Sequence, residues 1–470
     1  MRLADLTESA GSKTTFREGR QEGGSMKDKL EQTQTSTVPD RAKQDVETLG
    51  RDWSWVEATI WTERMLSALG NGVKGNKWFS LIDKVERPST LAAAWRKVAG
   101  NGGAAGVDRQ SIERFAANSD GYLGELSQSL RDRSYRPQAV RRVEIPKGDG
   151  KTRPLGIPTV KDRVVQTALK LVVEPIFEAQ FLDGSYGFRP GRGCKDALRE
   201  VDRLLKEGYT FVVDADLQSY FDTIPHNRLM QRVEERISDG AVLELIGNFL
   251  KQDILHGMQS WTPTGGTPQG AVISPLLANM YLHPLDVLMK DEGYRMVRYA
   301  DDFVILCSKR EDATAALEKV RAWVGENGLA LHPDKTHVGN CLEPGEGFEF
   351  LGYRFEAGTR EVRKKSLQRF KERMRRTTRR TAGKSLAQVI SELNPVLKGW
   401  FAYFKHAAAK TFSTLDAQIR RRLRAMLRKQ AKRPGAGRCL NDHLRWPNVY
   451  FAKAGLFAMH TGWLEARRPR

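Results

Sequence analysis

The sequence predicts an α+β protein in which a mixed sheet covered by helices is followed by a basic, purely helical region. Between residues 136 and 359, short runs of β-branched and aromatic residues alternate with segments of helical apolar spacing, and tight turns join them. From residue 360 onward the apolar residues recur at helical intervals only. The length of 470 residues is enough for roughly three domains.

The positive charge lies in the C-terminal quarter. Net charge is +20, and residues 360–470 hold 29 Lys/Arg against 6 Asp/Glu, whereas the first 359 residues hold 48 against 51. A merely solvated basic surface is the simpler interpretation, but so dense a charge would repel itself without a polyanion. We therefore expect this region to bind nucleic acid.

No apolar run is long enough to span a membrane, and the N-terminus lacks the apolar core of a signal peptide. The four cysteines lie far apart and form no CxxC pair. This pattern predicts a reducing cytoplasm, no membrane partner and no structural zinc site.

The elements are expected in the following order. Residues 1–50 are polar and poor in aromatics, which predicts a disordered leader, and residues 51–135 form a helical extension. A strand over 140–146 turns at 147–151 and returns over 152–158. This hairpin carries Lys147, Lys151 and Arg153, cations suited to gripping a triphosphate, although a basic surface hairpin would have the same pattern. Helices follow over 162–177 and 194–208.

A buried strand over 211–217 carries Asp214 and Asp216 at i and i+2, so both project from one face. Carboxylates on so apolar a strand are costly unless they are paired or bound to metal. One long helix is expected over 228–250 and another over 271–289, after the glycine-rich loop 265–270.

A second pair of carboxylates, Asp301 and Asp302, is expected at the turn of a hairpin over 294–307. Adjacent carboxylates repel each other, and a divalent cation would relieve this. The alternative is an ordinary acidic turn, since Asp is a common turn residue. A helix over 313–327, a strand over 329–338 with Lys335 and a strand pair over 348–355 follow.

In the C-terminal region we expect one helix over 386–393, a second beginning at Asn394-Pro395 and a third over 415–427. Cations surround the third helix too densely for a solvated face alone, and these are our candidate RNA contacts: Arg420, Arg421, Arg422, Arg424, Arg428 and Lys429.

Asp216, Asp301 and Asp302 come from neighbouring strands and could together hold two magnesium ions. Such a pair of ions serves in-line phosphoryl transfer, in which one activates a 3′-hydroxyl and the other stabilises the leaving pyrophosphate. A basic triphosphate grip and a polyanion-binding region complete the set of parts needed for template-directed nucleotide polymerisation.

The chain resembles the bacterial group II intron-encoded reverse transcriptase/maturases from about residue 52 to its end. The resemblance rests on an ordered series of motifs: Arg153-Pro154-Leu155-Gly156-Ile157-Pro158, Ser185-Tyr186-Gly187-Phe188-Arg189-Pro190, Thr267-Pro268-Gln269-Gly270, Ser274-Pro275-Leu276-Leu277, Tyr299-Ala300-Asp301-Asp302, Leu351-Gly352-Tyr353 and Leu397-Lys398-Gly399-Trp400-Phe401-Ala402-Tyr403-Phe404. It implies a right-hand polymerase with fingers and palm over 136–359, followed by a helical thumb/maturase domain over 360–470.

The resemblance also implies roles. Asp216 rather than Asp214 is the metal ligand of the first palm motif, and Phe221 is the gate that excludes a ribose 2′-hydroxyl. Further nucleotide-contact candidates are Gln269, Lys147, Lys151, Arg153, Arg163 and Lys335, the last as a proton donor to pyrophosphate. Expected partners are an RNA template, the host intron RNA, a DNA primer or target and deoxynucleoside triphosphates, in a bacterial cytoplasm.

One departure and two alternatives accompany this interpretation. Many relatives end in an endonuclease domain with paired cysteines. Because this sequence has no cysteine pairs, we expect no such domain, and priming from a nascent or nicked DNA strand. The alternatives are a retron, diversity-generating or CRISPR-associated reverse transcriptase, and an RNA splicing factor with a dead polymerase. The basic helical region argues against the first, and the three aspartates argue against the second.

Overall fold

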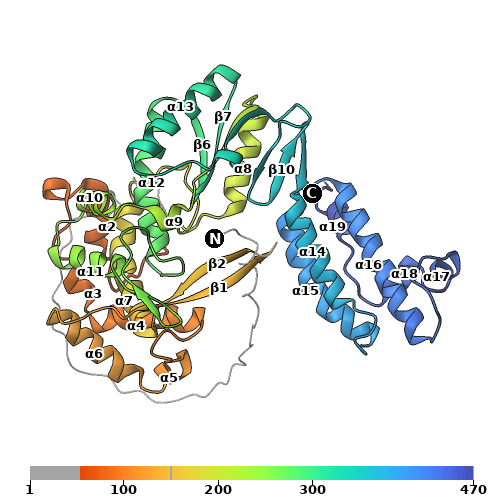
Figure 1. Cartoon of the computed structure of the whole chain (residues 1–470), viewed down its shortest axis with the longest axis horizontal. Helices are drawn as coiled ribbons and strands as arrows, with labels where there is room; N and C mark the ends of the chain where they lie inside the picture. Colours follow the sequence, from red (N-terminus) through yellow and green to blue (C-terminus); the bar gives the residue numbers. More distant parts are fainter. Residues whose placement is uncertain (1–52, 149–150, 469–470) are drawn as a thin grey trace, which may run out of the picture.

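The computed structural model describes residues 53–148 and 151–468. The expected leader over 1–50 lies outside the described residues. In the described parts of the chain, no helix combines the length and apolarity that crossing a membrane requires. Figure 1 shows two groups of elements: helices with the larger sheets, and a group of C-terminal helices (blue) beside the smallest sheet.

The helices before the first strand are α2 (Glu63–Asn71), α3 (Ile82–Val85), α4 (Pro88–Asn101), α5 (Ile112–Ala116) and α6 (Ser119–Arg131). Helices α3, α4 and α6 pack against α7 (Val160–Glu178), which is buried along almost its whole length. Such all-round burial explains why α7 is apolar on nearly every side rather than along one stripe.

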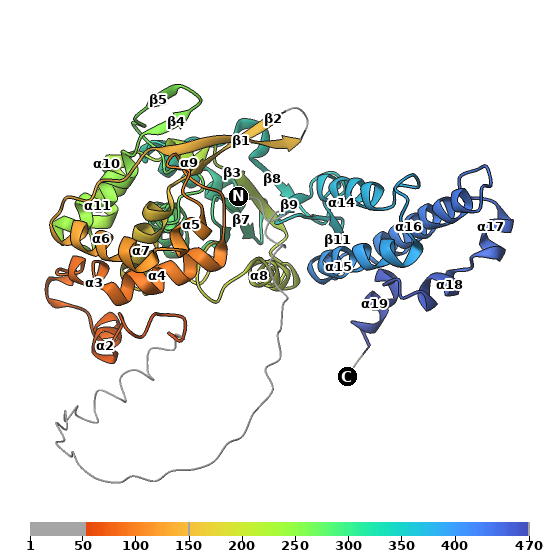
Figure 2. The same ribbon diagram turned by 90° about the horizontal axis from the view of Figure 1, so that it is seen from below.

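The first sheet has the strand order β2-β1-β4-β5, and we call it the hairpin sheet. Its strands are β1 (Val140–Gly148), β2 (Lys151–Ile157), β4 (Ile254–His256) and β5 (Gln259–Trp261). The antiparallel β1–β2 hairpin confirms the strand–turn–strand prediction, and Figures 1 and 2 show it pointing toward the C-terminal helices.

The second sheet has the order β6-β7-β3-β8, and we call it the central sheet. It consists of β3 (Phe211–Asp216), β6 (Arg295–Tyr299), β7 (Asp302–Cys307) and β8 (His337–Asn340), all antiparallel to their neighbours. Helices α8 (Cys194–Lys206), α12 (Ser274–Asp291) and α13 (Arg310–Glu326) pack against it.

The third sheet is a small meander of β9 (Phe348–Phe350), β10 (Tyr353–Glu356) and β11 (Thr359–Val362), which leads into the C-terminal helices. These are α14 (Lys364–Thr377), α15 (Leu386–Phe404), α16 (Ala409–Gln430), α17 (Leu440–Arg445), α18 (Asn448–Lys453) and α19 (Met459–Glu465). The structure thus has the mixed α+β fold with a helical C-terminal region that the sequence predicts.

Three element predictions were wrong in detail. The expected helix over 228–250 is two helices, α10 (His226–Glu234) and α11 (Gly240–Leu250). The two helices expected on either side of Asn394-Pro395 are one, α15, with Pro395 inside it. The strand expected over 329–338 is a single bridge at Leu331, a 3-10 turn over 333–335 and the start of β8.

The physical reasons lie in side chains that bond across the fold. Pro395 costs α15 one backbone hydrogen bond, but Val389, Leu393 and Leu397 keep the helix in the core. Asn394 does not cap the helix locally; instead its Nδ2 donates to the carbonyl of Gly455 at 2.8 Å.

The break before α11 depends on Asp239, whose carboxylate caps two helices. Its Oδ1 accepts from the N–H groups of Ala241 (3.0 Å) and Val242 (3.1 Å), and its Oδ2 from those of Leu81 (2.6 Å) and Ile82 (2.9 Å). Burial acts to raise the pKa of Asp239, but these four donors favour the charged form and leave the pKa below its ordinary value.

We expect Asp239→Ala to lower the free energy of unfolding by about 1–3 kcal/mol at pH 7, because two N-caps are lost together. Since the pKa of Asp239 is lowered on folding, its contribution is present above the unfolded value and is lost as pH falls through the folded value. Denaturant unfolding at pH 7 and near pH 3 checks this, and a penalty that grows toward low pH would contradict it.

Candidate active site

The three aspartates lie at one end of the central sheet. Strand β3 ends at Asp216 and β7 begins at Asp302, and these two residues are direct partners in the antiparallel register. Asp301 lies beside them in the two-residue turn between Tyr299 and Asp302. The structure therefore brings together the carboxylates that the sequence singled out, on the adjacent strands β3 and β7.

Lys335 lies at the same place. Its Nζ contacts the carboxylate of Asp216, and the N–H of His332 donates to the backbone carbonyl of Asp216 at 2.7 Å. The 3-10 turn over 333–335 thus holds a cation against the end of β3. An ammonium group beside Asp216 shows that this carboxylate takes a positive partner.

The residues present fit magnesium. In the described part of the chain, no group of three or more His, Cys, Asp or Glu side chains is arranged to hold a metal ion alone. Mg²⁺, however, usually binds through one or two carboxylates together with waters and substrate phosphates, rather than in an all-protein cage. Asp216, Asp301 and Asp302 supply only hard carboxylate oxygens, which is the donor type Mg²⁺ prefers.

The turn between β6 and β7 is held by Arg298, a residue that our sequence reasoning missed. The side chain of Arg298 is completely buried, and its guanidinium forms a fork with Asp286 of α12, with Nε to Oδ1 at 2.7 Å and Nη2 to Oδ2. Its Nη1 donates to the carbonyl of Ala300 at 3.0 Å and to Asn279 Oδ1 at 2.9 Å. Ala300 has a positive φ of 59°, which is strained for a residue with a Cβ, so this bond stabilises an unfavourable turn.

A loop over 184–187 supports the same turn from the other side. The N–H of Arg298 donates to the carbonyl of Gly184, and the N–H of Tyr186 donates to the carbonyl of Arg298, both at 2.8 Å. A Cβ on Gly187 would lie 2.2 Å from the backbone nitrogen of Ala300, so only glycine fits there. This contact explains why the Ser185–Pro190 motif must carry a glycine.

Helix α15 approaches the same turn from the C-terminal region. Tyr299 and Tyr403 both lie near the thiol of Cys194, whose pKa is raised by burial. Tyr403 Oη also donates to the carbonyl of Leu351 at 2.8 Å, and Tyr353 Oη donates to the carbonyl of Tyr403 at 2.6 Å. Helix α15 is therefore bonded to the third sheet, and its Tyr403 lies near Tyr299, the residue before the β6–β7 turn.

Asp214, the other carboxylate of β3, has a separate environment. Its register partner is His337, and its Oδ2 accepts from the N–H of Glu349 at 3.4 Å. Burial, with a smaller contribution from the negative charge of Asp216, raises the pKa of Asp214 to about 6, against the opposing effects of His337 and the Glu349 N–H.

Phe221 and Gln269 lie where the 265–270 loop contacts the segment after Asp216. Phe221 is buried on the short helix α9 (Tyr220–Thr223), and its carbonyl accepts from the N–H of Thr267 at 2.7 Å. Gln269 Nε2 lies 3.4 Å from Asp222 Oδ2, and the carbonyl of Gln269 accepts from the N–H of Gly156 at 2.6 Å. The 265–270 loop thus joins the hairpin sheet to the segment that follows Asp216.

Glycines allow this loop to approach so closely. Gly266 (φ 83°) would place a Cβ 2.8 Å from the carbonyl of Phe221, and Gly270 (φ 109°) would place one 2.3 Å from the carbonyl of Gly156. A side chain at either position would push the loop away from the site.

The predicted triphosphate cations lie in different surroundings. Burial raises the pKa of Asp222, and the nearby charges of Arg142 and Arg153 oppose this rise, which places Arg153 close to the Gln269 contact. Arg163 is buried and donates to the carbonyls of Gly102 (3.2 Å) and Ala104 (2.7 Å), so it holds the 102–105 loop. Phosphate contact by either arginine stays a prediction.

Lys147 and Lys151 belong to the ends of β1 and β2, but their side chains lie outside what the structure describes.

The six predicted RNA contacts of α16 fall into two groups. Arg424 is buried and donates to the carbonyl of Trp446 and to Asn448 Oδ1, both at 2.8 Å. Arg428 pairs with Asp442 at 2.6 Å. These two arginines hold α17 and α18 in place. Lys429 is exposed, and Arg420, Arg421 and Arg422 are half-buried. RNA contact by all six stays a prediction.

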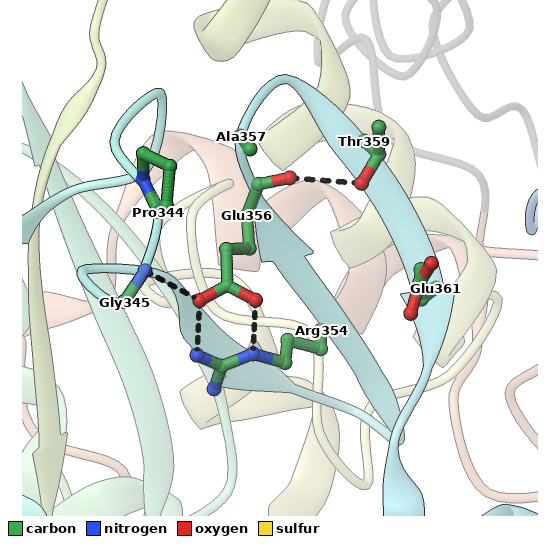
Figure 3. A pocket seen from close by; sticks show the side chains of 7 residues that line it. All are labelled: Pro344, Gly345, Arg354, Glu356, Ala357, Thr359 and Glu361. Atoms are coloured by element: carbon green, nitrogen blue, oxygen red, sulfur yellow. Dashed lines mark hydrogen bonds and ion pairs between the residues drawn. The ribbon is translucent and has the colours of Figure 1, made fainter.

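A cavity of about 240 Å³ lies between the 344–345 loop and the β10–β11 hairpin (Figure 3). The Glu356 carboxylate accepts from Arg354 Nη2 at 2.6 Å, Arg354 Nε at 2.9 Å and the N–H of Gly345 at 2.9 Å. The Arg354 bonds, followed by that from Gly345, lower the pKa of Glu356 to about 2. The ion pair satisfies itself and is part of the scaffold.

Two protein-family models match successive parts of this chain. A family model described as reverse transcriptase (RNA-dependent DNA polymerase) matches residues 145–355, and one described as group II intron, maturase-specific domain matches residues 367–446. The protein YkfC of Escherichia coli K12 is 35% identical over 315 residues, which cover 58% of this chain and 82% of YkfC. The chain belongs to the group II intron reverse transcriptase/maturase family.

A second relative is the group II intron-encoded protein LtrA of Lactococcus lactis, 39% identical over 203 residues. The match covers 43% of this chain and a third (33%) of LtrA. Two solved structures are more distant: a partial Cas6-RT-Cas1–Cas2 complex (TM-score 0.34, 26% identity, 53% of this chain and 41% of that one) and Candida albicans telomerase (TM-score 0.38, 12% identity, 77% and 69%). TM-scores this low decide neither fold nor function.

We expect Arg298→Lys to slow primer extension about 100-fold, because a small displacement of the turn would misplace Asp301 and Asp302. The free energy of unfolding should fall by about 2–3 kcal/mol, since lysine cannot form the fork with Asp286. The matched control is Arg295→Lys on the exposed end of the same strand. Single-turnover extension and denaturant unfolding check both effects; equal rates in the two variants would contradict the role given to Arg298.

Proposed function

We propose that this reverse transcriptase polymerises DNA on an RNA template at Asp216, Asp301 and Asp302, and binds intron RNA through its C-terminal helices in support of splicing and retrotransposition. The observation that carries the proposal is the register of Asp216 against Asp302, beside a turn that a buried arginine holds in shape. Charge supports the second half, since residues 360–470 carry the positive excess of the chain.

The proposed division of the chain follows the same line. Residues 136–359 would form the fingers and palm, residues 51–135 a helical extension and residues 360–470 the thumb and maturase domain. The four cysteines are free thiols, in keeping with a reducing bacterial cytoplasm as the place of action.

At the catalytic end, the three aspartates would hold two magnesium ions. Bound there, the ions would lower the pKa of the primer 3′-hydroxyl and stabilise the pyrophosphate leaving group. Lys335 Nζ, now at the carboxylate of Asp216, is the nearest candidate to give a proton to that leaving group.

The residues around this end would select and orient the nucleotide. The ring of Phe221 packs edge-on against Tyr220, with centroids 5.5 Å apart, and would stand where a 2′-hydroxyl needs room. Gln269 and Arg153 would contact the base-sugar unit and the phosphates respectively, because the 265–270 loop brings both close to Asp222. Template RNA, primer DNA and deoxynucleoside triphosphates are thus the proposed partners.

Each of the two alternative functions conflicts with one feature of the chain. A retron-like or CRISPR-associated enzyme would need no maturase domain, whereas residues 367–446 match the maturase-specific family model. A polymerase-dead splicing factor would have no use for the aligned carboxylates.

Asp301→Ala combined with Asp302→Ala should slow extension of a DNA primer on an RNA template with magnesium by at least about 10⁴-fold, because the proposed metal ligands at the β6–β7 turn are lost. The matched control is Asp334→Asn, an exposed carboxylate beside Lys335, which should leave the rate unchanged. Persistent synthesis by the double variant would show that the site is elsewhere.

Phe221→Val should raise incorporation of ribonucleotides relative to deoxynucleotides by at least about tenfold, because the smaller side chain opens space for the 2′-hydroxyl. Phe221→Tyr keeps the ring and should keep the selectivity. The kcat/KM ratio for the two substrates measures this, and an unchanged ratio for Phe221→Val would remove the gate assignment.

A further inference from the structure

A small pocket between α14 and α16 collects positive charge with no acid to balance it. Lys371 and Arg375 reach it from α14, one helical turn apart, and Arg421 and Arg422 reach it from α16, together with Gln418. No carboxylate lines this pocket, whose volume is about 60 Å³. We call it the cationic pocket; both helices belong to the blue group in Figure 2.

The floor of the cationic pocket is apolar. Phe370 and Met374 of α14 and Leu415 and Ile419 of α16 line it, and each is at most 4% exposed. Charges next to such a floor are less well screened than charges in open water, so the four cations repel one another more strongly than a solvated face would. An anion in the pocket would relieve that repulsion.

Arg422 is fixed in place rather than free to turn away. Its Nε donates to Thr378 Oγ1 at 2.5 Å and its Nη2 to the carbonyl of Arg375 at 3.0 Å, while Nη1 takes no part in either bond. Burial, then the charges of Arg375 and Arg421, lower the pKa of Arg422 from its ordinary value. The fold therefore holds a guanidinium where its positive neighbours disfavour it.

Other arginines of α16 do have partners that offset or hold their charge. Arg428 is paired with Asp442, and Arg424 is satisfied by Trp446 and Asn448. The cations of the cationic pocket lack such a counter-charge among its lining residues. A solvated face would instead spread its charges away from one another.

The size fits a tetrahedral oxyanion. One water-sized group needs about 10–15 Å³ of such space, so the cavity holds roughly four to six of them. A backbone phosphate presents four oxygens, and arginine guanidinium groups bind it with charge-assisted, often bidentate hydrogen bonds.

We propose that the cationic pocket clamps one backbone phosphate of bound nucleic acid, with Lys371 and Arg375 of α14 acting together with Arg421 and Arg422 of α16. The inference rests on the proposed function and refines it, since it adds two α14 residues to the predicted contacts and removes Arg424 and Arg428 from the direct contacts. A template–primer duplex and a folded intron RNA both present this chemistry.

The test compares two double variants that lose the same charge. Arg375→Gln with Arg421→Gln removes two of the four cations that line the pocket and leaves Arg422 and its hydrogen bonds intact. Arg379→Gln with Arg433→Gln removes two exposed arginines from the same helical region, outside the pocket. Affinity is measured against salt for a group II intron RNA and for an RNA-template/DNA-primer duplex, with thermal melting as a check on folding.

For the pocket variant we expect Kd to rise about tenfold at low salt for at least one of the two nucleic acids, and the slope of log K against log salt to fall by about 1. The control variant should show a clearly smaller change. The nucleic acid that responds identifies the source of the phosphate. Equal behaviour of the two variants on both nucleic acids would overturn the proposal.

Two further outcomes are separated in advance. If the unsubstituted protein bound neither nucleic acid and extended no primer, the proposed function itself would fail. If the pocket variant unfolded, Lys371→Gln takes its place, since it removes one cation at the edge of the pocket; a salt slope identical to that of the unsubstituted protein would then overturn the clamp.

Discussion

The bidentate pair between Arg298 and Asp286 is the interaction on which the geometry of the β6–β7 turn, and so of the proposed active site, depends. It joins strand β6 to helix α12, and the remaining nitrogen of the same guanidinium holds the carbonyl of Ala300. A buried pair of this kind adds little net stability compared with apolar packing, but removing one partner leaves an uncompensated charge. Its value here is geometric, because it keeps a strained turn in one conformation and so sets where Asp301 and Asp302 lie.

Close backbone contacts connect the β6–β7 turn and the segment after Asp216 to neighbouring loops. Gly187 allows the 184–187 loop to lie directly against Ala300, and Gly266 and Gly270 allow the 265–270 loop to touch both the hairpin sheet and the carbonyl of Phe221. Tyr403 of α15 lies near Tyr299, the residue before the turn. Segments far apart in the sequence therefore connect the proposed nucleotide-contact residues to Asp216, Asp301 and Asp302 through close backbone contacts.

Much of this could be predicted from the sequence because it depends on local pattern. The hairpin with Asp301 and Asp302 and the strand with Asp216 follow from short runs of β-branched, aromatic and other apolar residues, and the misfit of a carboxylate in an apolar strand indicated the site. Arg298 breaks the same rule on the next strand and could have been found in the same way. The partner Asp286 could not, because it lies on a helix whose docking is a tertiary event.

The wrong helix boundaries and the mixed set of predicted RNA contacts also come from tertiary contacts that the local sequence does not show. Asp239 caps the start of α11 and also the start of α3, near position 81, and Asn394 bonds to residues near position 456, so these contacts join segments far apart in the sequence. Cation density on α16 could not separate Arg424, which is buried, from Arg421, which lines the cationic pocket. The sequence shows that an arginine is present, whereas its contacts in the fold decide whether it holds the structure together or can bind a ligand.

The central claim is that Asp216, Asp301 and Asp302 form one metal site. Its most direct test is a crystal structure with an RNA template, a chain-terminated DNA primer, an incoming deoxynucleotide and manganese, read by anomalous scattering. We predict two peaks about 3.5–4 Å apart, bound by Asp216 and by the aspartates of the β6–β7 turn, with Lys335 displaced from Asp216. Manganese bound away from these carboxylates, with the Asp216–Lys335 contact intact, would contradict the account.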